Sequence, residues 1–363
     1  FATHSEIEGE DLMASVTRYA LEAICDHPFE TPLDIQRETF DDIYRHAQKI
    51  TQKNDLRKTF ALNALVGVDN ALWTLYFREN HCKTFDDIIP ESCRPGLSFR
   101  HDKVAAIPLM AYAIPVPEIV QAVDSGYFFM KIKIGQPGTQ EEMLEKDKAR
   151  LTEVHAAIGN RQTPYTKSGK LPYYFDANGR YEKKETLLKL IDHAQKIGAA
   201  DQIAIIEEPF DEFAEIDVHD VPVRLAADES AHTVEDAIER IERGYRAMAL
   251  KPAAKTLSMS MQIAQAAFER NVPCFCADLT VNPILVDWNK NVAARLAPFP
   301  DIGIGLLESN GHQNYRNWPT MLSYLPEPDA PWVQPEGGVY HTEESFYRQS
   351  GNIFVDPKHY RPE

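Results

Sequence analysis

The feature that most constrains the fold of this 363-residue chain is an alternation of short apolar runs with amphipathic helical stretches, which begins near residue 101. Eight apolar runs occur, at residues 105–114, 126–135, 171–179, 202–210, 223–230, 246–253, 272–280 and 301–309. The stretches between them space apolar residues by three and four and often end at Gly or Asn, as helices do. Continuous apolar strands joined by helices are typical of a parallel sheet that is covered on both faces. Eight such units predict an α/β fold in which the sheet closes into a (β/α) barrel.

The regions on either side of this alternation have a different character. Residues 1–100 contain three stretches with helical spacing and no obvious strand, whereas residues 321–363 are rich in Pro and Gly. We predict an N-terminal module (1–100), a barrel (101–320) and a C-terminal segment (321–363) that returns to the first module. The chain opens abruptly at "FATHSEIEGED", so the module is expected to lack its true start.

Charge and cysteine content narrow the class of partner. The formal net charge of −17 argues against nucleic acid and anionic membrane surfaces, because both select for clustered Lys and Arg. Five scattered cysteines without a CxxC pair indicate neither a disulfide framework nor a structural zinc site. No apolar run has membrane-spanning length, and the start shows no signal-peptide pattern. A protein of the reducing cytoplasm that acts on a small molecule fits these features.

Charged or polar residues stand at the ends of seven successive predicted strands. In chain order they are Lys131 with Lys133, Asp176 with Asn178, Glu207 with Glu208, Asp228 with Glu229, Lys251, Asp278 and Glu308. Any one of them could be a helix cap or a loop charge, and "ADES" is a good capping sequence. The repetition across seven strands is not explained in that way. In a barrel of this type, reactive groups sit where the strands end.

Two of these residues share one strand. Lys131 and Lys133 lie two positions apart in "FFMKIKIG", so their side chains point to the same face. Taken alone, this stretch fits an edge strand with a solvated face, because charged groups are seldom buried without partners. The alternative is a pair of cations directed into a site.

Three carboxylates are predicted to converge on one side of the barrel mouth, because Asp176, Glu207 and Asp228 end three consecutive strands. Hard oxygen ligands suit Mg²⁺, with Mn²⁺ as a possible substitute, and three anions without a cation would raise one another's pKa. We prefer Glu207 to Glu208 because Glu207 continues the alternation of the preceding strand. Asp228 is preferred to Glu229 by similar reasoning.

The lysines of the second and sixth strands would face each other across the barrel axis. Two bases on opposite sides of one bound substrate suit removal of a proton from carbon on one side and its return from the other. Nearby positive charge from Lys131 and Mg²⁺ would lower the pKa of Lys133 toward neutrality. The metal would stabilise the enediolate that forms when a carboxylate substrate loses its α-proton.

At these positions the chain resembles the enolase superfamily, on the branch of muconate-lactonising enzymes, o-succinylbenzoate synthases and dipeptide epimerases. The matching motifs, in order, are "KIK" (131–133), "DAN" (176–178), "EEP" (207–209), "ADES" (227–230) and "LKP" (250–252). Each tripeptide is a weak signal, but their order at successive strand ends is specific. The stretch "GVDNALWTLYF" (67–77) also resembles the helix before the barrel in this family.

The resemblance implies a modified TIM barrel of the (β/α)7β type, with an α+β capping domain built from the N-terminal region and the C-terminal segment. It implies that Asp176, Glu207 and Asp228 bind Mg²⁺ and that Lys133 and Lys251 form the acid/base pair. Lys131 would contact the substrate carboxylate or tune Lys133. A homo-oligomer is also implied.

The end of strand eight departs from the family pattern. Dipeptide epimerases often carry Asp-x-Asp on strand eight, whereas this chain has "LLESNG", where Glu308 and Asn310 could take part of that role. Strand seven offers Asp278 and no His, which resembles this branch and not the mandelate racemase branch, and Asp278 is either a substrate contact or a plain loop carboxylate. Together with Asn178, these residues are the predicted substrate contacts.

The expected function is that of a Mg²⁺-dependent racemase or epimerase acting α to a carboxylate, on an amino-acid derivative, a dipeptide or an acid sugar. Three alternatives remain open. The same groups could end the reaction as a dehydratase or cycloisomerase. One lysine could form a Schiff base, which leaves the three carboxylates unexplained. The barrel could also bind an acid without converting it.

Overall fold

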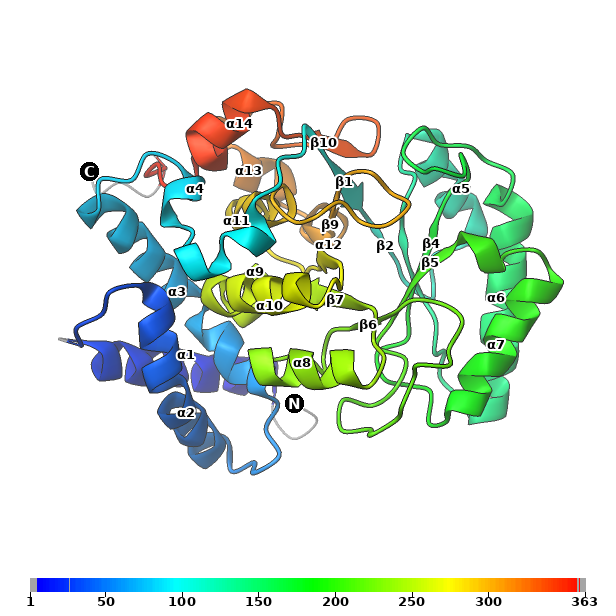
Figure 1. Cartoon of the computed structure of the whole chain (residues 1–363), viewed down its shortest axis with the longest axis horizontal. Helices are drawn as coiled ribbons and strands as arrows, with labels where there is room; N and C mark the ends of the chain where they lie inside the picture. The colour runs from blue at the N-terminus through cyan, green and yellow to red at the C-terminus, as the bar shows by residue number, and fades with distance from the viewer. Residues whose placement is uncertain (1–4, 26, 358, 360–363) are drawn as a thin grey trace.

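The strands of the protein form one curled sheet, seen in a computed structural model that describes residues 5–25, 27–357 and 359 (Figure 1). The strands are β1 (Lys103–Ile107), β2 (Leu109–Met110), β3 (Lys131–Lys133), β4 (Tyr173–Asp176), β5 (Ile203–Glu207), β6 (Leu225–Ala227), β7 (Ala247–Leu250), β8 (Cys274–Cys276), β9 (Gly305–Glu308) and β10 (Val339–His341). From β2 to β9, each strand pairs in parallel with the next strand along the chain.

One stretch of chain joins both ends of this sheet. β1 and β2 are separated only by Pro108; β1 pairs with β9, and β2 pairs with β3. The Pro108 carbonyl also accepts a hydrogen bond from Lys131 N (3.0 Å). The sheet therefore closes on itself, and the predicted barrel is confirmed.

The barrel strands are short and almost wholly buried, which explains why the sequence shows continuous apolar runs. Aromatic side chains fill part of the space between them. The rings of Tyr174 and Phe275 meet edge to face at 5.5 Å, and Phe129 lies 5.6 Å from Tyr174. The barrel is thus a packed core whose polar groups are concentrated where the strands end.

Helices cover the barrel and form the N-terminal part of the chain. The longer ones are α1 (Glu6–Ile24), α2 (Pro32–Thr51), α3 (Lys58–Glu79), α5 (Val116–Asp124), α6 (Gln140–Ile158), α7 (Lys184–Lys196), α8 (Val234–Glu242), α10 (Leu257–Glu269) and α11 (Pro283–Ala293). The short ones are α4 (Phe85–Ile88), α9 (Pro252–Lys255), α12 (Gly311–Asn314), α13 (Trp318–Leu322) and α14 (Glu344–Gln349), with 3₁₀ turns η1 (Glu91–Cys93), η2 (Pro95–Leu97), η3 (Ala200–Gln202) and η4 (Ser350–Asn352). None of the described helices combines the length and apolar character needed to cross a membrane.

Several helices begin at a reciprocal cap that the sequence encodes. Thr139 accepts a hydrogen bond from Glu142 N while Glu142 accepts one from Thr139 N, which fixes the start of α6. Thr233 and Asp236 form the same arrangement at the start of α8. These caps place the first turns of both helices directly after barrel strands and their loops.

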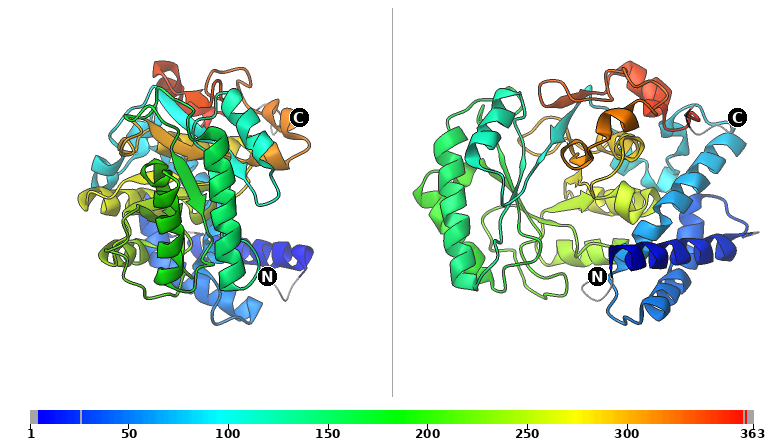
Figure 2. Two further views of the ribbon diagram at one scale, coloured as in Figure 1. Left: turned by 90° about the vertical axis from the view of Figure 1, so that its right-hand side faces the viewer. Right: turned by 180° about the vertical axis from the view of Figure 1, so that it is seen from behind.

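The N-terminal helices pack on one flank of the barrel beside α10, whereas α6 and α7 lie on the opposite flank (Figures 1 and 2). A buried polar contact joins α3 to α10. Ser258 N donates to Asp69 (3.0 Å) and Ser258 Oγ also contacts this carboxylate, while Trp73 Nε1 donates to Ser258 Oγ (2.9 Å). The module is therefore attached to the barrel through hydrogen bonds as well as apolar packing.

The C-terminal segment returns across both parts of the chain. β10 pairs antiparallel with β1, and the Phe354 ring stacks on Phe77 of α3 at 3.9 Å. Ser350 Oγ accepts a hydrogen bond from Phe85 N (2.7 Å). The division of the chain into domains near residues 100 and 320 stays a prediction.

The buried Asp69 gives a testable pH dependence. Burial raises the pKa of Asp69 to about 6 from an ordinary value of 3.8, outweighing the hydrogen bonds from Ser258. The folded state therefore holds the proton more tightly, so this stabilisation is present below pH 3.8 and is lost as the pH rises through 6. Between pH 4 and 7, the free energy of unfolding of the wild type should fall by about 2 kcal/mol relative to Asp69→Asn. Urea unfolding at pH 4 and pH 7 measures this change in the free energy of unfolding. The control Asp192→Asn, at an exposed position, should show the same change as the wild type. A fall in Asp69→Asn equal to that of the wild type would contradict the role of Asp69.

Candidate active site at the strand ends

The register of the sheet brings three predicted site residues into one row. Lys133 lies opposite Asp176, and Asp176 lies opposite Glu207, on β3, β4 and β5. Residues in one row of a parallel sheet point to the same face, and here that face is the barrel interior. Glu207 lies opposite Ala226, so Asp228, two residues further on, comes just past the end of β6 on the same side.

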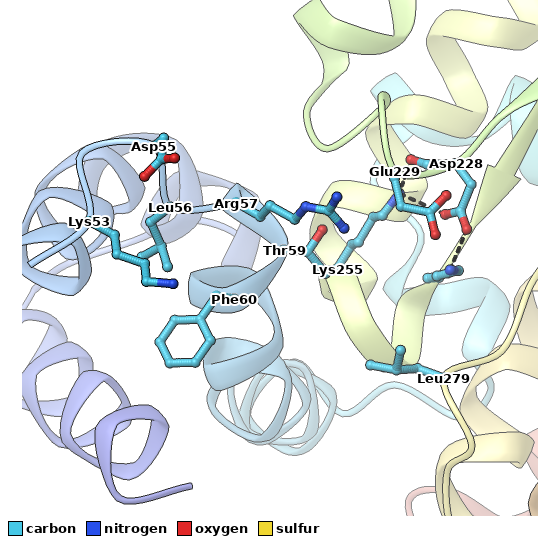
Figure 3. A pocket seen from close by; sticks show the side chains of 11 residues that line it. Lys53, Asp55, Leu56, Arg57, Thr59, Phe60, Asp228, Glu229, Lys255 and Leu279 are labelled. Atoms are coloured by element: carbon cyan, nitrogen blue, oxygen red, sulfur yellow. Dashed lines mark hydrogen bonds and ion pairs between the residues drawn. The ribbon is translucent and has the colours of Figure 1, made fainter. Parts of the chain in front are cut away.

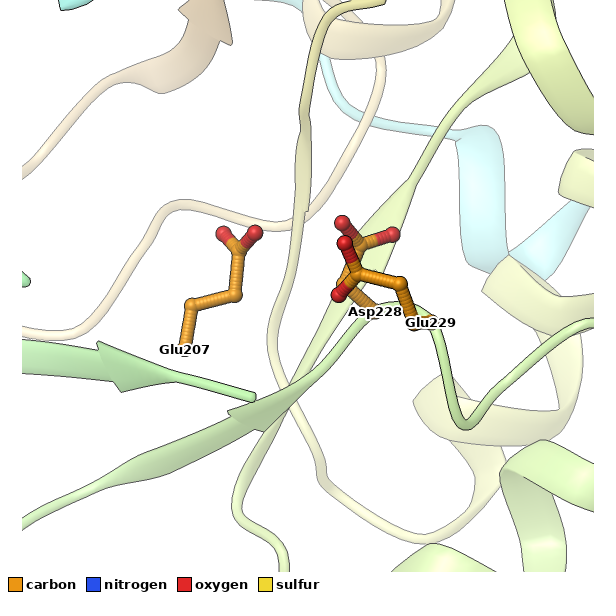
Figure 4. A group of neighbouring side chains, drawn as sticks. All are labelled: Glu207, Asp228 and Glu229. Carbon is orange, nitrogen blue, oxygen red and sulfur yellow. The ribbon is translucent and has the colours of Figure 1, made fainter. Parts of the chain in front are cut away.

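An acidic cluster lies at this position. Glu207, Asp228 and Glu229 offer carboxylate oxygens that all lie within 4.8 Å of one another (Figure 4). Asp176 joins the group through Lys131, whose ammonium nitrogen lies 2.9 Å from Asp176 Oδ2 and 2.8 Å from Glu207 Oε1. Four carboxylates from three strand ends therefore share a small buried region.

Lys131 is buried at the centre of these anions. Its side chain is 4% exposed, and a third carboxylate, Glu308, lies 3.1 Å from its nitrogen. Burial disfavours the charged ammonium, but the attraction of Asp176, Glu207 and Glu308 outweighs it and raises the pKa of Lys131. The strand is thus no solvated edge, and the two lysines point into the site.

Lys133 connects to the opposite wall of the site through Asn178. The ammonium group of Lys133 contacts Asp176 and the Asn178 side-chain oxygen, and Asn178 Nδ2 donates to Glu229 Oε1 (3.0 Å). Asn178 holds a left-handed backbone conformation (φ 44°), which Asn tolerates better than most residues. This turn directs its amide between the ends of β4 and β6.

Two lysines hold Asp228. Lys251 forms an ion pair with Asp228 Oδ2, while Lys255 Nζ lies 3.1 Å from Oδ1 and donates to the backbone carbonyls of Asp228 and Ala231. Burial disfavours the charged form of each group, yet their attraction raises the pKa of Lys251 and lowers that of Asp228. Asp228 is therefore ionised and fixed at both its side chain and its backbone.

Glu208 turns away from the cluster, toward the loop after β6. Its Oε2 accepts hydrogen bonds from Asp228 N (2.6 Å) and from Ser230 N and Oγ. Burial, then the neighbouring Glu229, raises the pKa of Glu208 to about 8. It supports the backbone that carries Asp228, and Glu207 is the residue of the pair that faces the site.

The remaining predicted site residues form a second group across the mouth. Asp278 Oδ2 accepts a hydrogen bond from Asn310 N (2.8 Å), and Glu308 accepts one from Asp278 N (3.1 Å) and one from Asn310 Nδ2 (3.2 Å). Burial, then the charge of Glu308, raises the pKa of Asp278 to about 6. Through Glu308, this group reaches Lys131.

The acidic cluster fits a divalent cation. Its donors are hard carboxylate oxygens, which Mg²⁺ prefers. Glu229 Oε2 is buried without a hydrogen-bond partner among the described residues, and burial together with Asp228 raises the pKa of Glu229. A cation at this position would satisfy that oxygen and reduce the repulsion among the four anions.

A pocket of about 490 Å³ opens beside the cluster (Figure 3). The barrel forms one side with Asp228, Glu229, Lys251, Lys255 and Leu279, and the other side comes from residues 53–60, the turn between α2 and α3 together with the first turn of α3. The site is therefore shared between the barrel and the N-terminal helices.

Comparison with protein families identifies this architecture. Residues 116–304, just over half of the chain, match the family model "enolase C-terminal domain-like". The chain belongs to this family. No match was found among curated proteins.

Solved structures of the enolase superfamily share the fold at low identity. A mandelate racemase/muconate-lactonising enzyme from Bordetella bronchiseptica RB50 is 18% identical, with a TM-score of 0.62 over 92% of this chain and 82% of that one. A dipeptide epimerase from Enterococcus faecalis V583, complexed with Mg and L-Leu-L-Tyr, is 17% identical, with a TM-score of 0.56 over 82% and 73%. A mandelate racemase/muconate-lactonising protein from Herpetosiphon aurantiacus is 14% identical, with a TM-score of 0.58 over 90% and 80%.

Sequence reasoning missed several residues of this enolase-like site. Lys255 lies one helical turn after Lys251, and this i, i+4 spacing was a usable signal. Tyr174, which donates to Glu207, lies two residues before Asp176 on the same face of β4. Glu229 was set aside in favour of Asp228, although both reach the cluster, because strand alternation does not extend into the loop after β6.

Lys255 should contribute measurably to the stability of the enolase-like barrel. Lys255→Met keeps most of the side-chain volume but leaves the buried carbonyls of Asp228 and Ala231 without their donor. We expect the free energy of unfolding to fall by about 1–3 kcal/mol, the usual cost of an unpaired buried polar group. Denaturant unfolding measures the stability of Lys255→Met against the control Lys189→Met, at an exposed lysine of α7. Equal stability of the two variants would contradict a stabilising role of Lys255.

Proposed function

We propose that the protein is a Mg²⁺-dependent racemase or epimerase that moves the proton α to a carboxylate. Lys133 and Lys251 would be the two acid/base groups, and Asp176, Glu207 and Asp228 the metal ligands. The observation that carries this proposal is that each lysine is ion-paired with a carboxylate at a different edge of one acidic cluster, Lys133 with Asp176 and Lys251 with Asp228.

The topology supports a reaction at two faces. Lys133 ends β3 and Lys251 follows β7, and the intervening strands β4, β5 and β6 carry the carboxylates. In a barrel of eight parallel strands, positions four strands apart lie on opposite sides of the axis. A substrate held above the acidic cluster would thus have one lysine on each face of its α-carbon.

The cation would supply the electrostatic part of the chemistry, by drawing electron density from the substrate carboxylate and so acidifying the α-proton. The residues of the chain would do the rest. One lysine removes the proton, and the other, in its ammonium form, returns a proton to the opposite face. Lys131, which is ion-paired with three carboxylates, would keep a positive charge beside the acidic cluster.

Substrate contacts are proposed from the groups that rim the cluster. Asn178 already bridges Lys133 and Glu229, and the group of Asp278, Glu308 and Asn310 lies on the other side of Lys131. The relatives with solved structures include a dipeptide epimerase, which supports an epimerase assignment. A dehydratase or cycloisomerase reaction is the second candidate, because elimination or ring opening after α-proton loss uses the same groups.

The reaction can be tested by proton NMR in D₂O with Mg²⁺, against acid sugars, dipeptides and N-acyl amino acids. We expect the α-proton signal of a substrate to disappear through exchange, because either lysine exchanges its proton with solvent. EDTA should abolish the exchange. In each of the variants Lys133→Ala and Lys251→Ala, exchange should persist with at most one enantiomer or epimer. For the other stereoisomer, the exchange rate should be about 10²-fold or more below that of the wild type.

The product distinguishes the two candidate reactions. An epimerase gives the other stereoisomer with deuterium at the α-carbon, whereas a dehydratase gives a product without that stereocentre. Lys189→Met, far from the site on α7, serves as the matched control. Unchanged exchange in both lysine-to-alanine variants would sink the two-base assignment.

The metal ligands can be tested without turnover. Isothermal titration with Mg²⁺ and Mn²⁺ should show one site, and Asp228→Asn should weaken binding by more than about 100-fold, because losing an outer-shell partner alone costs 10- to 100-fold. Glu229→Gln reports whether the fourth carboxylate takes part. Glu235→Gln, on the exposed surface of α8, is the control, and wild-type affinity in Asp228→Asn would contradict the proposal.

A further inference from the structure

The second end of the 490 Å³ pocket is built differently from its acidic end. The same cavity that reaches Asp228 and Lys251 is also lined by Leu279 on the barrel side and by Leu56 and Phe60 on the opposite wall (Figure 3). A ligand whose carboxylate lies at the acidic cluster would therefore project its remaining atoms toward these three apolar side chains.

Leu279 is the most informative of the three. It is 44% exposed at the mouth of the barrel, although its neighbour Asp278 is buried within a hydrogen-bond network. Leu56 and Phe60 come from the opposite wall, at the turn before α3 and in its first turn. Apolar side chains that face one another across a pocket gain free energy when an apolar group fills the space and excludes water.

The wall that carries Leu56 and Phe60 is fastened to the barrel. Three consecutive residues, Arg57, Lys58 and Thr59, each contact a different barrel residue, and we call these contacts the clamp. Arg57 Nε lies 2.5 Å from Glu212, Lys58 Nζ lies 3.0 Å from Asp236, and Thr59 Oγ1 lies 2.7 Å from His232 Nδ1.

The barrel side of the clamp is itself connected. His232 Nε2 lies 2.8 Å from Glu212 Oε2, and the Glu212 side chain is only 2% exposed. Burial lowers the pKa of His232, so a neutral ring can donate to Glu212 while it accepts from Thr59. The clamp therefore presents Leu56 and Phe60 at a fixed place over the barrel mouth before any ligand binds.

The charges of this wall are balanced, which argues against a second anionic group on the ligand. Two cations, Lys53 and Arg57, stand beside two anions, Asp55 and the Glu212 that pairs with Arg57. Figure 3 shows Arg57 reaching from the wall toward Glu229, away from Leu56 and Phe60. The formal charges of these four residues therefore sum to zero.

We propose that the substrate carries an apolar substituent on the carbon next to its carboxylate, and that Leu56, Phe60 and Leu279 bind this substituent. The inference rests on the proposed function, since it assumes that the carboxylate lies at the acidic cluster. It selects, among the candidate substrates, acids with an aliphatic or aromatic chain over polyhydroxylated acids, because burial of hydroxyl groups against apolar side chains costs free energy.

Calorimetric titration of the Mg²⁺-loaded full chain tests this directly. The probes are 2-hydroxy acids with three to six carbons, together with gluconate, which has the six-carbon skeleton of 2-hydroxyhexanoate with four more hydroxyls. We expect Kd to fall by about fourfold for each added methylene that becomes buried. Gluconate should bind at least tenfold more weakly than 2-hydroxyhexanoate.

Variants locate the effect. Leu279→Ser should flatten the dependence of Kd on chain length while leaving binding of the three-carbon acid within about twofold of the wild type. Leu75→Ser, at an equally exposed leucine of α3 outside the pocket, should keep the full dependence. If a variant unfolds, the wild-type series alone still decides the question.

The outcomes separate this inference from the proposed function. Chain-length dependence without α-proton exchange would retain the apolar subsite and overturn the racemase proposal. Exchange that is equally fast on gluconate, or a Kd independent of chain length, would overturn the apolar subsite and retain the proposed function. Failure of every probe to bind the Mg²⁺-loaded protein would overturn the subsite as well.

Discussion

The mouth of the barrel depends on the pairing of buried carboxylates with buried lysines. Asp176, Glu207 and Asp228 are fully buried, and an unpaired charge at such depth would cost several kcal/mol. Asp176 is ion-paired with Lys131 and Lys133, Glu207 with Lys131, and Asp228 with Lys251 and Lys255. Because these groups are carried by barrel strands, the loops that follow them or the short helix α9 after β7, the closure of the sheet and the charge balance of the site depend on one another.

Much of this could be predicted from the sequence, because it follows from two short periodicities. The alternation of apolar runs with helical stretches predicts the parallel barrel, and the two-residue period of a strand places Lys131 with Lys133 on the inner face. The same two-residue period correctly predicts that Glu207, and not Glu208, faces the site. Where the chain leaves a strand the period ends, which is why the place of Glu229 could not be derived.

Contacts between distant parts of the chain could not be predicted. The clamp joins residues 57–59 to barrel residues more than 150 positions away, and no local pattern marks such partners. His232 is an example, because it is buried between Glu212 and Thr59, and Thr59 lies 173 positions earlier in the chain. The stretch at Pro108 that closes the sheet, and the pairing of β10 with β1, are long-range features of the same kind.

The clamp has a further consequence for how such a protein can change. The groups proposed for chemistry stand at the ends of barrel strands, whereas Leu56 stands on the turn before α3 and Phe60 in its first turn, on either side of the clamp residues. Substitutions or insertions in that turn, before Arg57, would alter the shape of the pocket without disturbing the packed barrel, since loops tolerate such variation well. Substrate range and reaction type can thus diverge independently, and relatives with identical strand ends need not share a substrate.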